Sequence, residues 1–468
     1  MPGRRIVDIA RSTEPMRDIA ASVTAGKRRL WVSGLLGSSK SLLAAVLARE
    51  LPHVWVVIAP TFSDAEHAYD DLATFLGEDA VQLYSEWETL PYERRSPLAT
   101  ITESRLLTLS RLAAGEPIVI VTTPKAVMQT TLSRRLLAET THKLSVGATL
   151  NPESFTRSLI DLGYKRVRLV EDSGDFSVRG GIIDLMPFGY DDPVRVELDG
   201  DLIESIRQFD VYSQRSLRGL DEVLVLPRRE VVLKEEGGAE IAQRLREEYP
   251  GDSEDRDHLL NGLETRFYFD GVEQYLPTIN GEAETLIDHL PDAAGIFTVR
   301  SDEVWDRAEQ LSLEAAKIFH EKREQVPLCD PESLLVPFDR LMERVGKRPI
   351  VSSGLVAPAG LEGYERWSVD AKLQESFGSD LELLRTRLAE LSRDNRVLIM
   401  CDNKGQAMRL SELLGETATD VALEVGSLEK GFALPAAGLI VYTDHDIFDR
   451  YRRRRRRKFR GGAPISSF

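Results

Sequence analysis

Cysteine, paired histidines and long apolar runs are all scarce in this chain of 468 residues. Its two cysteines, Cys329 and Cys401, lie far apart, which argues against a disulfide framework and for a reducing compartment. The seven histidines are scattered, and none pairs with another at a metal-ligand spacing. No apolar stretch approaches the roughly 20 residues of a membrane-spanning helix, and the N-terminus lacks the apolar region of a signal peptide. We therefore expect a cytoplasmic protein with no membrane segment and no metal site.

Positive charge is also in short supply. The chain has 60 Lys and Arg against 76 Asp and Glu, a formal net charge of −16. Because proteins grip DNA phosphates with Lys and Arg, this balance argues against DNA binding as the main task, although a local basic patch could still bind. The densest basic run, 452–458, could contact nucleic acid, or it could be a solvated linker helix that leads to a further domain.

What the chain does contain is an alternation of apolar strands and helices. Continuous apolar strands at 29–33, 54–60 and 118–121 are separated by helical stretches at 63–76 and 102–114. Such strands are typical of a parallel sheet that is covered on both faces. We therefore predict a doubly wound α/β sheet.

From about residue 150 the pattern changes to short strands separated by turn signals, which is typical of antiparallel hairpins. These strands are expected at 167–170, 176–185, 194–198 and 202–209. The alternation of helix and strand then resumes. Its last part, with strands at 396–401 and 438–442, predicts a third α/β unit.

The turn after the first strand has the layout of a phosphate-binding P-loop, in which backbone N–H groups cradle phosphate, a Lys neutralises charge and a hydroxyl holds Mg²⁺. Gly34, Lys40 and Ser41 fit the spacing G-x-x-x-x-G-K-[ST], and Gly37 lies within the loop. Ser39 stands where the second Gly belongs, and its Cβ disfavours a positive φ. The loop is either a nucleotide site with one altered residue or a degenerate turn that caps a helix.

Several motifs resemble one protein family. They are Trp-Glu-Thr-Leu-Pro-Tyr at 87–92, Gly-Tyr at 163–164, Arg-Gly-Gly-Ile-Ile-Asp-Leu-Met-Pro at 179–187 and Phe-Asp-Val-Tyr-Ser-Gln-Arg at 209–215. Together they resemble the N-terminal half of the bacterial transcription-repair coupling factors, the Mfd family, a half that is itself similar to the repair protein UvrB. The resemblance covers essentially the whole chain and is loosest over 346–450.

The resemblance implies a RecA-like P-loop-type parallel sheet domain with an inserted antiparallel β-rich module and a further C-terminal α/β domain. The expected boundaries are 1–125 for the first part of the RecA-type domain, 126–213 for the inserted module that interacts with UvrA, 214–345 for the rest of the UvrB-like domain, 346–450 for the third domain and 451–468 for a basic linker toward an RNA-polymerase-interacting domain.

The family's function is implied in the same way. A full-length member would be an ATP-dependent DNA translocase that displaces stalled RNA polymerase and recruits nucleotide excision repair. The present part would recruit UvrA and regulate the full-length protein. RNA polymerase and DNA would be bound through the missing C-terminal part, and ATP and Mg²⁺ by its motor domains. Intramolecular contacts with those domains could mask the UvrA-binding face.

A P-loop motor also needs an acid at the end of a neighbouring strand to hold Mg²⁺. In UvrB the strand resembling 295–299 is followed directly by Asp-Glu, but here Arg300 occupies that position and the acids Asp302 and Glu303 come two residues later. Two residues shift a side chain by roughly 6–7 Å along a strand. We therefore expect no catalytic residue in this chain and no cofactor bound by it.

A turn at Ser173-Gly174 would place Arg168 opposite Arg179, with Arg166, Arg168 and Arg179 on one face of a hairpin. Like charges opposite each other are unfavourable, so stability alone does not explain them. We interpret them as a docking face for an acidic partner surface. They could instead pair with local acids. The resemblance implies UvrA as the partner, with Arg166 and Arg179 matching contacting arginines of UvrB, although a third falls at Ser177. The candidate partner-binding residues are Arg166, Arg168, Phe176 and Arg179.

Two other functions stay open. The chain could be an active UvrB-like P-loop NTPase that binds damaged DNA, which Arg300 argues against. It could also be a DNA-binding module, which the net charge of −16 disfavours. UvrB carries an aromatic-rich hairpin that clamps DNA, but here 87–97 leads almost directly into a helix, so we expect Trp87 and Tyr92 to be packing residues.

Overall fold

A computed structural model of the chain describes residues 2–233, 238–248, 254–265, 268–281, 283–323, 328–355, 363–378, 380–415 and 421–448. The predicted basic linker 451–468, including the run 452–458, lies outside these residues. Across the described ranges, no helix combines the length and the apolar character that crossing a bilayer would require.

The central element is a seven-stranded sheet in the order β17-β1-β16-β15-β2-β4-β3, and every pair in it is parallel. The strands are β1 (Arg29–Ser33), β2 (Trp55–Ile58), β3 (Val81–Leu83), β4 (Val119–Thr122), β15 (Gly295–Thr298), β16 (Ile350–Ser353) and β17 (Glu365–Ser368). The predicted doubly wound α/β sheet is confirmed. The two strands β16 and β17 follow residue 346, so the predicted start of a third domain there is wrong.

Helices cover both faces of this sheet because alternate strand residues point to opposite sides. Val57 and Phe297 pack in one core, and Val56 and Ile296 pack in another. The first face carries α1 (Pro2–Arg11), α2 (Met16–Thr24), α3 (Ser39–Glu50) and α4 (Phe62–Leu76). The second carries α5 (Ala99–Ala113), α6 (Pro124–Met128), α7 (Arg134–Thr140), α12 (Ser301–Lys322) and α14 (Phe338–Val345).

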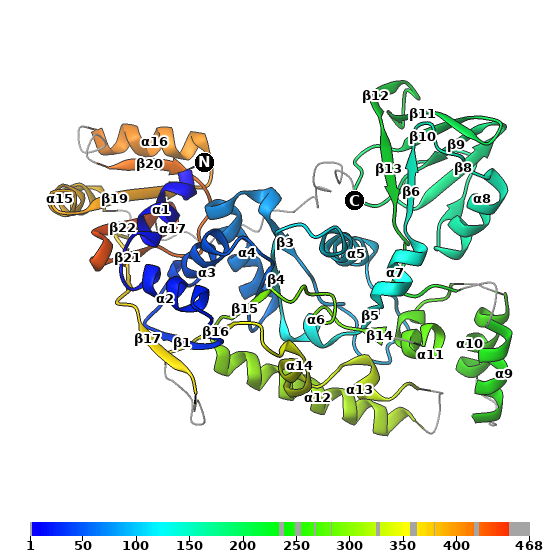
Figure 1. Cartoon of the computed structure of the whole chain (residues 1–468). Helices are drawn as coiled ribbons and strands as arrows, with labels where there is room; N and C mark the ends of the chain where they lie inside the picture. The colour runs from blue at the N-terminus through cyan, green and yellow to red at the C-terminus, as the bar shows by residue number, and fades with distance from the viewer. Residues whose placement is uncertain are drawn as a thin grey trace.

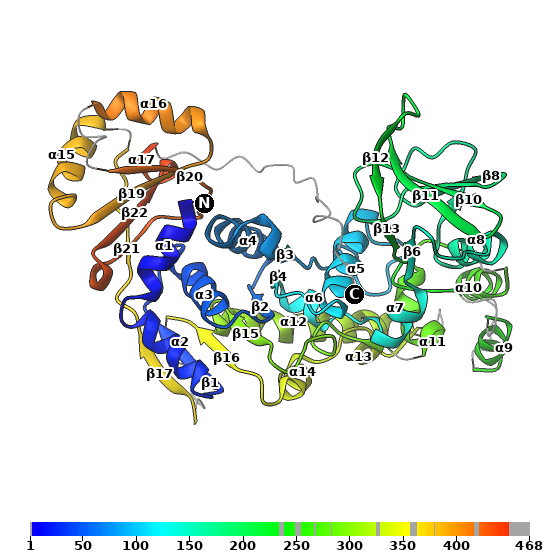
Figure 2. The same cartoon turned by 45° about the horizontal axis from the view of Figure 1, so that its top comes forward.

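A second sheet belongs to what we call the C-terminal unit, residues 372–448. Its order is β18-β21-β22-β19-β20. The strands are β18 (Lys372–Leu373), β19 (Arg396–Cys401), β20 (Ala422–Val425), β21 (Phe432–Leu434) and β22 (Leu439–Thr443), with helices α15 (Leu381–Leu391), α16 (Lys404–Leu414) and α17 (Asp444–Phe448). Met400, Phe432 and Val441 share the core of α1, α3 and α4. These helices are therefore enclosed between the two sheets (Figures 1 and 2).

The β-module, residues 142–225, lies at the opposite end of the central sheet from the C-terminal unit (Figure 1). Its six-stranded sheet has the order β12-β11-β10-β9-β8-β7. The strands are β7 (Lys165–Arg166), β8 (Asp175–Arg179), β9 (Ile182–Leu185), β10 (Val194–Asp199), β11 (Leu202–Phe209) and β12 (Ser216–Leu220), and β6 (His142–Ser145) pairs with β13 (Glu222–Val225). Its core includes Phe155 and Leu159 of α8 (Pro152–Asp161). The predicted range 126–213 therefore begins and ends too early.

The remaining elements connect the central sheet to the β-module. They include α9 (Gly238–Glu248), α10 (Glu254–Thr265), α11 (Leu276–Asn280) and α13 (Pro331–Leu334), together with the short strand pair β5 (Thr131–Leu132) and β14 (Ala283–Glu284). Leu245, Leu259, Leu276 and Leu334 of these helices form a separate small core.

Candidate functional site

The P-loop-like turn, residues 34–41, connects β1 to α3. Gly34 and Gly37 adopt positive φ values of 76° and 56°, conformations that only glycine tolerates easily. Ser39 is the first residue of α3 and has no positive φ. Its hydroxyl donates to the Leu36 carbonyl at 2.7 Å. The penalty that we predicted for a Cβ at Ser39 therefore does not arise, because the residue is helical.

Two segments fill the open side of this turn. The segment with Val369 leads into the C-terminal unit, and the segment with Lys430 and Gly431 belongs to it. The Ser38 N–H donates to the carbonyl of Lys430 at 3.1 Å, and the Lys430 N–H donates back to the Ser38 hydroxyl at 3.2 Å. A Cβ on Gly34 would lie 2.0 Å from the carbonyl oxygen of Val369, and one on Gly37 would lie 2.6 Å from that of Gly431. Oxygen atoms of the chain itself thus crowd the turn where a P-loop would hold phosphate oxygens.

Asp71 of α4 closes the turn from a third side. Its side chain is fully buried, and Oδ1 accepts the N–H of Glu429 at 2.7 Å. Burial and, to a smaller extent, the charge of Glu429 raise the pKa of Asp71 to about 7, against the lowering effect of hydrogen bonds from the Glu429 N–H, Ser41 and Ser38. Ser41 is buried in this cluster. Its hydroxyl, which would hold Mg²⁺ in a working P-loop, instead faces a carboxylate. Lys40 is partly exposed and makes no ion pair with a described residue.

Arg300 follows the carboxyl end of β15, the position at which a P-loop motor would carry a Mg²⁺-binding acid. Its strand β15 is separated from β1 by β16, so Arg300 does not face the turn from an adjacent strand, as we had inferred. The residue adopts φ 50° before α12. Its guanidinium pairs with Asp64 at 2.5 Å and with Glu303 at 3.1 Å. The cation is therefore compensated locally by two acids.

The aromatic residues of the 87–92 motif are packing residues, as predicted. Trp87 and Tyr92 are buried. The Trp87 indole N–H donates to Glu230 at 2.9 Å, and Glu230 in turn pairs with the buried Arg105 at 2.7 Å. The Tyr92 hydroxyl donates to the carbonyl of Cys329 at 2.9 Å. Neither ring is available to stack on a base.

The predicted hairpin around Ser173-Gly174 is wrong. Strand β7 pairs with β8 in parallel, with Lys165 beside Asp175 and Arg166 beside Phe176. The N–H of Lys165 donates to Gly174 and that of Val167 donates to Phe176, so the chain between them leaves the sheet and returns in the same direction. The antiparallel partner of β8 is β9. The turn signal Ser173-Gly174 by itself cannot distinguish a hairpin turn from a loop that leaves the sheet and returns in the same direction.

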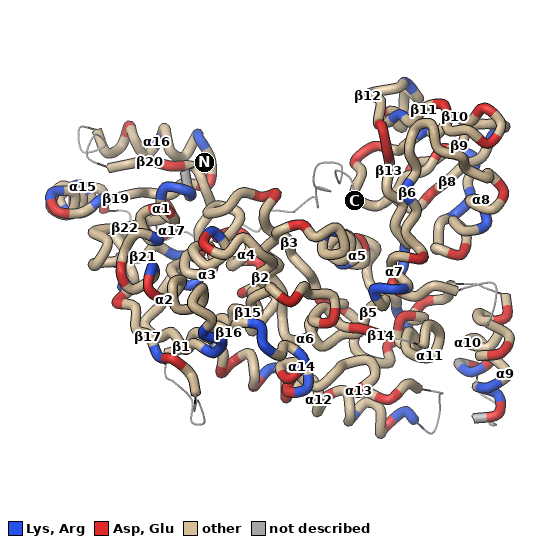
Figure 3. The backbone as a smooth tube through the Cα atoms, viewed as in Figure 1, with Lys and Arg blue, Asp and Glu red and all other residues tan. Residues whose placement is uncertain are grey.

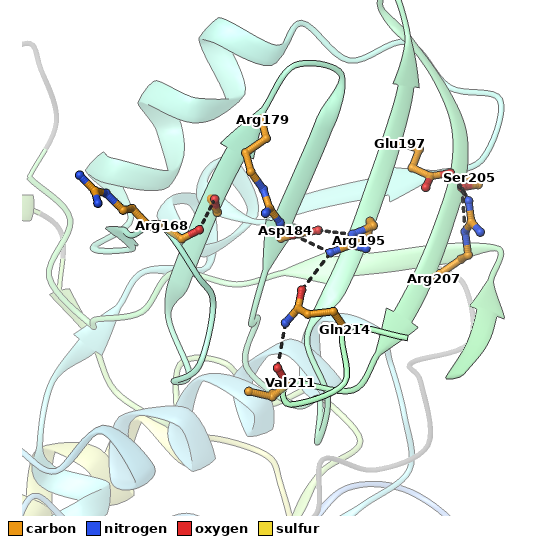
Figure 4. A network of polar contacts seen from close by, with 10 residues as sticks. Arg168, Arg179, Asp184, Arg195, Glu197, Ser205, Arg207, Val211 and Gln214 are labelled. Atoms are coloured by element: carbon orange, nitrogen blue, oxygen red, sulfur yellow. Dashed lines mark hydrogen bonds and ion pairs between the residues drawn. The ribbon is translucent and has the colours of Figure 1, made fainter. Parts of the chain in front are cut away.

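The parallel register also separates the arginines. Arg166 lies beside Phe176, whose side chain points into the core, whereas Arg179 follows Ser177 on the other side of β8. Figure 4 shows the Arg168 side chain pointing away from Arg179. The three arginines therefore do not share one face. Phe176 is 0% exposed, so its assignment as a partner-binding residue is wrong.

Arg179 is held by an acid that we did not predict. The carboxylate of Asp184, which is 3% exposed, pairs with Arg179 at 2.6 Å and with Arg195 at 2.7 Å. Arg195 also donates to Gln214 at 3.3 Å, and Gln214 donates to the carbonyl of Val211 at 2.8 Å. The network in Figure 4 thus joins the two motifs 179–187 and 209–215. Sequence reasoning missed Arg195, although its alternation with Glu197 on one strand marks a polar sheet face.

A different set of cations is exposed at the edge of the sheet. Lys165, Arg166 and Arg168, which we call the edge cations, are all exposed. Within the described ranges, none of their side chains forms an ion pair or hydrogen bond. Lys165 was missed because it falls outside the assumed hairpin. Edge strand β7 therefore presents positive charge that the chain does not neutralise through direct pairing.

Comparisons with known proteins agree with this architecture. A family model described as the UvrB interaction domain matches residues 143–230, which covers the β-module. Proteins named transcription-repair-coupling factor are similar over most of the chain: that of Bacillus subtilis is 23% identical over 96% of it, that of Mycobacterium bovis 28% over 88% and that of Escherichia coli 26% over 92%. The chain spans only 40%, 36% and 39% of these relatives.

The similarity to these relatives runs over most of the chain, and the family-model match lies within it, at the β-module. Over about 90% of its length, the chain is therefore similar to the N-terminal part of proteins named transcription-repair-coupling factor, and residues 143–230 match the UvrB interaction domain.

Proposed function

We propose that this chain is the UvrA-recruiting and regulatory part of a transcription-coupled DNA repair factor. The matched UvrB interaction domain and the relatives named transcription-repair-coupling factor support this proposal. In a full-length protein, ATP-driven translocation on DNA and displacement of RNA polymerase would belong to parts beyond the matched span. Intramolecular contacts with those parts would cover the recruiting surface until the motor engages its substrate.

The observation that carries the recruitment proposal is the set of edge cations on β7 and just after it. Lys165, Arg166 and Arg168 are exposed without a carboxylate partner in the described structure. A protein surface gains little from such a cluster by itself, but an acidic partner can pair with the arginines through bidentate hydrogen bonds. Arg179 is about half exposed, yet Asp184 already engages it. It would therefore contribute less to docking than Arg166 and Arg168.

Titration of UvrA with charge-reversal variants tests this order. The double variant Arg166→Glu with Arg168→Glu should weaken binding by at least about tenfold, or about 1.4 kcal/mol, whereas Arg179→Glu alone should weaken it less. Arg409→Glu is the matched control, since Arg409 is also exposed and has no ion-pair partner in the described part of the chain, but lies on α16 in the C-terminal unit. Equal affinity of the double variant and the control for UvrA would refute docking through β7.

The rival function is an active UvrB-like P-loop NTPase, and we propose that the P-loop-like turn instead seats the C-terminal unit. The contacts of Ser38 with Lys430 and the burial of Ser41 beside Asp71 support this role. ATP turnover by the chain, with and without DNA, should stay at the level of Lys40→Ala. A DNA-stimulated rate that Lys40→Ala abolishes would establish the rival function.

A further inference from the structure

An open cleft of about 910 Å³ lies between α1 and the start of strands β19 and β22 in the C-terminal unit. Arg4 and Arg5 contribute from α1, and Arg393 and Arg396 contribute from the other wall. Figure 3 shows the basic segment of α1 close to the N-terminal label, on the side of the C-terminal unit. In a chain with a net charge of −16, four arginines around one cleft are a local reversal of sign.

These four arginines differ from Arg11 and Arg387 nearby because they have no partner among the described residues. Each is exposed, and none of the four guanidinium groups forms an ion pair or hydrogen bond with a described residue. By contrast, Arg11 on the same helix pairs with Glu50 at 2.6 Å, and Arg387 on α15 pairs with Glu375 at 2.8 Å.

Two acids line the cleft and do not neutralise it. Asp8 lies 3.8 Å from Arg11 and 3.9 Å from Arg49, so its charge is already shared by arginines other than the four. Asp394 is the other acid in the lining. The cleft therefore retains an excess of positive charge.

Helix stability does not explain the first pair. Arg4 and Arg5 lie in the first turns of α1, which has no acidic residue in its first turn. Positive side chains near a helix N-terminus are disfavoured by the helix dipole. An anion bound in the cleft would offset both this cost and the mutual repulsion of the two walls.

We propose that this arginine cleft binds the phosphodiester backbone of nucleic acid. Its lining is polar, with Ser12, Thr13 and Ser392 among the arginines, and it contains no aromatic ring on which a base could stack. Hydroxyls and arginines are typical phosphate-contacting groups, and such contacts carry no sequence information. The cleft thus gives the chain a surface for the nucleic-acid backbone that is separate from the β-module.

The P-loop-like turn positions one wall of this cleft. Val369 and Ala371 bond to β1 and Gly34, and Lys430 bonds to Ser38, which fixes the C-terminal unit against the helices that include α1. This arrangement brings Arg393 and Arg396 to the same cleft as Arg4 and Arg5. The P-loop-like turn would therefore support nucleic-acid binding indirectly, by holding the C-terminal unit in place.

Fluorescence anisotropy with a short labelled DNA duplex tests the proposal. The experiment uses the full chain in which each Arg of 452–457 is replaced by Gln, so that the C-terminal basic run does not dominate binding. Affinity should fall with salt with a slope of about −3.6 in log–log form, at about −0.9 for each of four neutralised phosphates. The pair Arg4→Ala with Arg393→Ala should reduce that slope to about −1.8.

Lys404→Ala with Arg409→Ala is the matched control, because both residues are exposed cations of α16 in the C-terminal unit that do not line the cleft. Circular dichroism checks that every variant is folded. An unchanged salt slope in the cleft variant would overturn the proposal. So would the loss of all DNA binding when the 452–457 run is neutralised, or full displacement of the duplex by equimolar tripolyphosphate.

Discussion

The P-loop-like turn and the edge of the β-module differ in where their polar groups find partners. In the turn, the N–H of Ser38 and the hydroxyls beside Asp71 are engaged by the chain itself, and Gly34 and Gly37 leave room only for its carbonyl oxygens. At the β7 edge, Arg166 and Arg168 reach solvent unpaired within the described structure. The P-loop-like turn, which has a recognisable motif, is thus filled by the chain itself. The β7 edge, which has no recognisable motif, is the region that can accept a partner.

This difference implies different responses to mutation. Groups that the fold already uses should affect stability strongly and binding only indirectly. Groups that the fold leaves unpaired should affect binding and hardly alter stability. The predictions below test this separation.

The largest effect is expected from Asp71→Asn as pH rises. The pKa of Asp71 is raised from 3.8 to about 7 by burial, so between those values the folded state holds a proton that the unfolded state has lost. Stability of the wild type should therefore fall as pH rises from about 4 to 7, by up to about 4 kcal/mol at 1.36 kcal/mol per unit. Asn cannot ionise and keeps an acceptor for the Glu429 N–H. Urea unfolding at several pH values should show the free energy of unfolding of the variant rising relative to that of the wild type up to pH 7. If the two free energies change in parallel with pH, Asp71 is not buried against the turn.

The second effect compares two glycines with positive φ. Gly34→Ala would place a Cβ 2.0 Å from the Val369 carbonyl, whereas Gly26→Ala, at φ 94°, would meet nothing within 4 Å. Both variants incur the left-handed backbone cost of roughly 1–2 kcal/mol. Only Gly34→Ala must also displace the backbone at Val369, in the segment that leads into the C-terminal unit. We expect a loss of about 3 kcal/mol or more for Gly34→Ala in urea unfolding. Equal losses would show that the turn is open rather than filled.

Structural features that depend on residues close together in the sequence could be predicted, whereas features that depend on distant segments could not. The parallel sheet follows from long apolar runs such as 54–60, because burial on both faces leaves few other arrangements. The parallel pairing of β7 with β8 requires the chain to leave the sheet and return in the same direction, and no local sequence pattern indicates this path. The antiparallel hairpin that we predicted instead placed Arg166 and Arg179 on one face. The filling of the turn by Val369 and Lys430 joins segments more than 300 residues apart, and the motif itself contains no trace of it.

The third effect concerns the buried carboxylate of the β-module. Asp184→Ala would leave Arg195 without its main partner and free Arg179, so we expect a loss of about 2 kcal/mol, within the 1–3 kcal/mol typical of an unsatisfied buried polar group. Thermal unfolding of the chain measures this loss. Glu197→Ala is the control on the same sheet face, since it removes a more exposed partner of Arg207 and should cost under about 1 kcal/mol. If both variants cost the same, the network in Figure 4 is not a structural anchor.

The smallest effect is the one that defines a binding surface. Arg166→Ala and Arg168→Ala should each change the free energy of unfolding by less than about 0.5 kcal/mol, because exposed side chains without partners contribute little to the folded state. The same variants should weaken UvrA binding, since truncation removes charge that only the partner uses. Urea unfolding and UvrA titration of the same preparations measure both quantities. A stability loss that parallels the binding loss would place these arginines in the same class as the occupied turn, and the distinction between the two regions would fail.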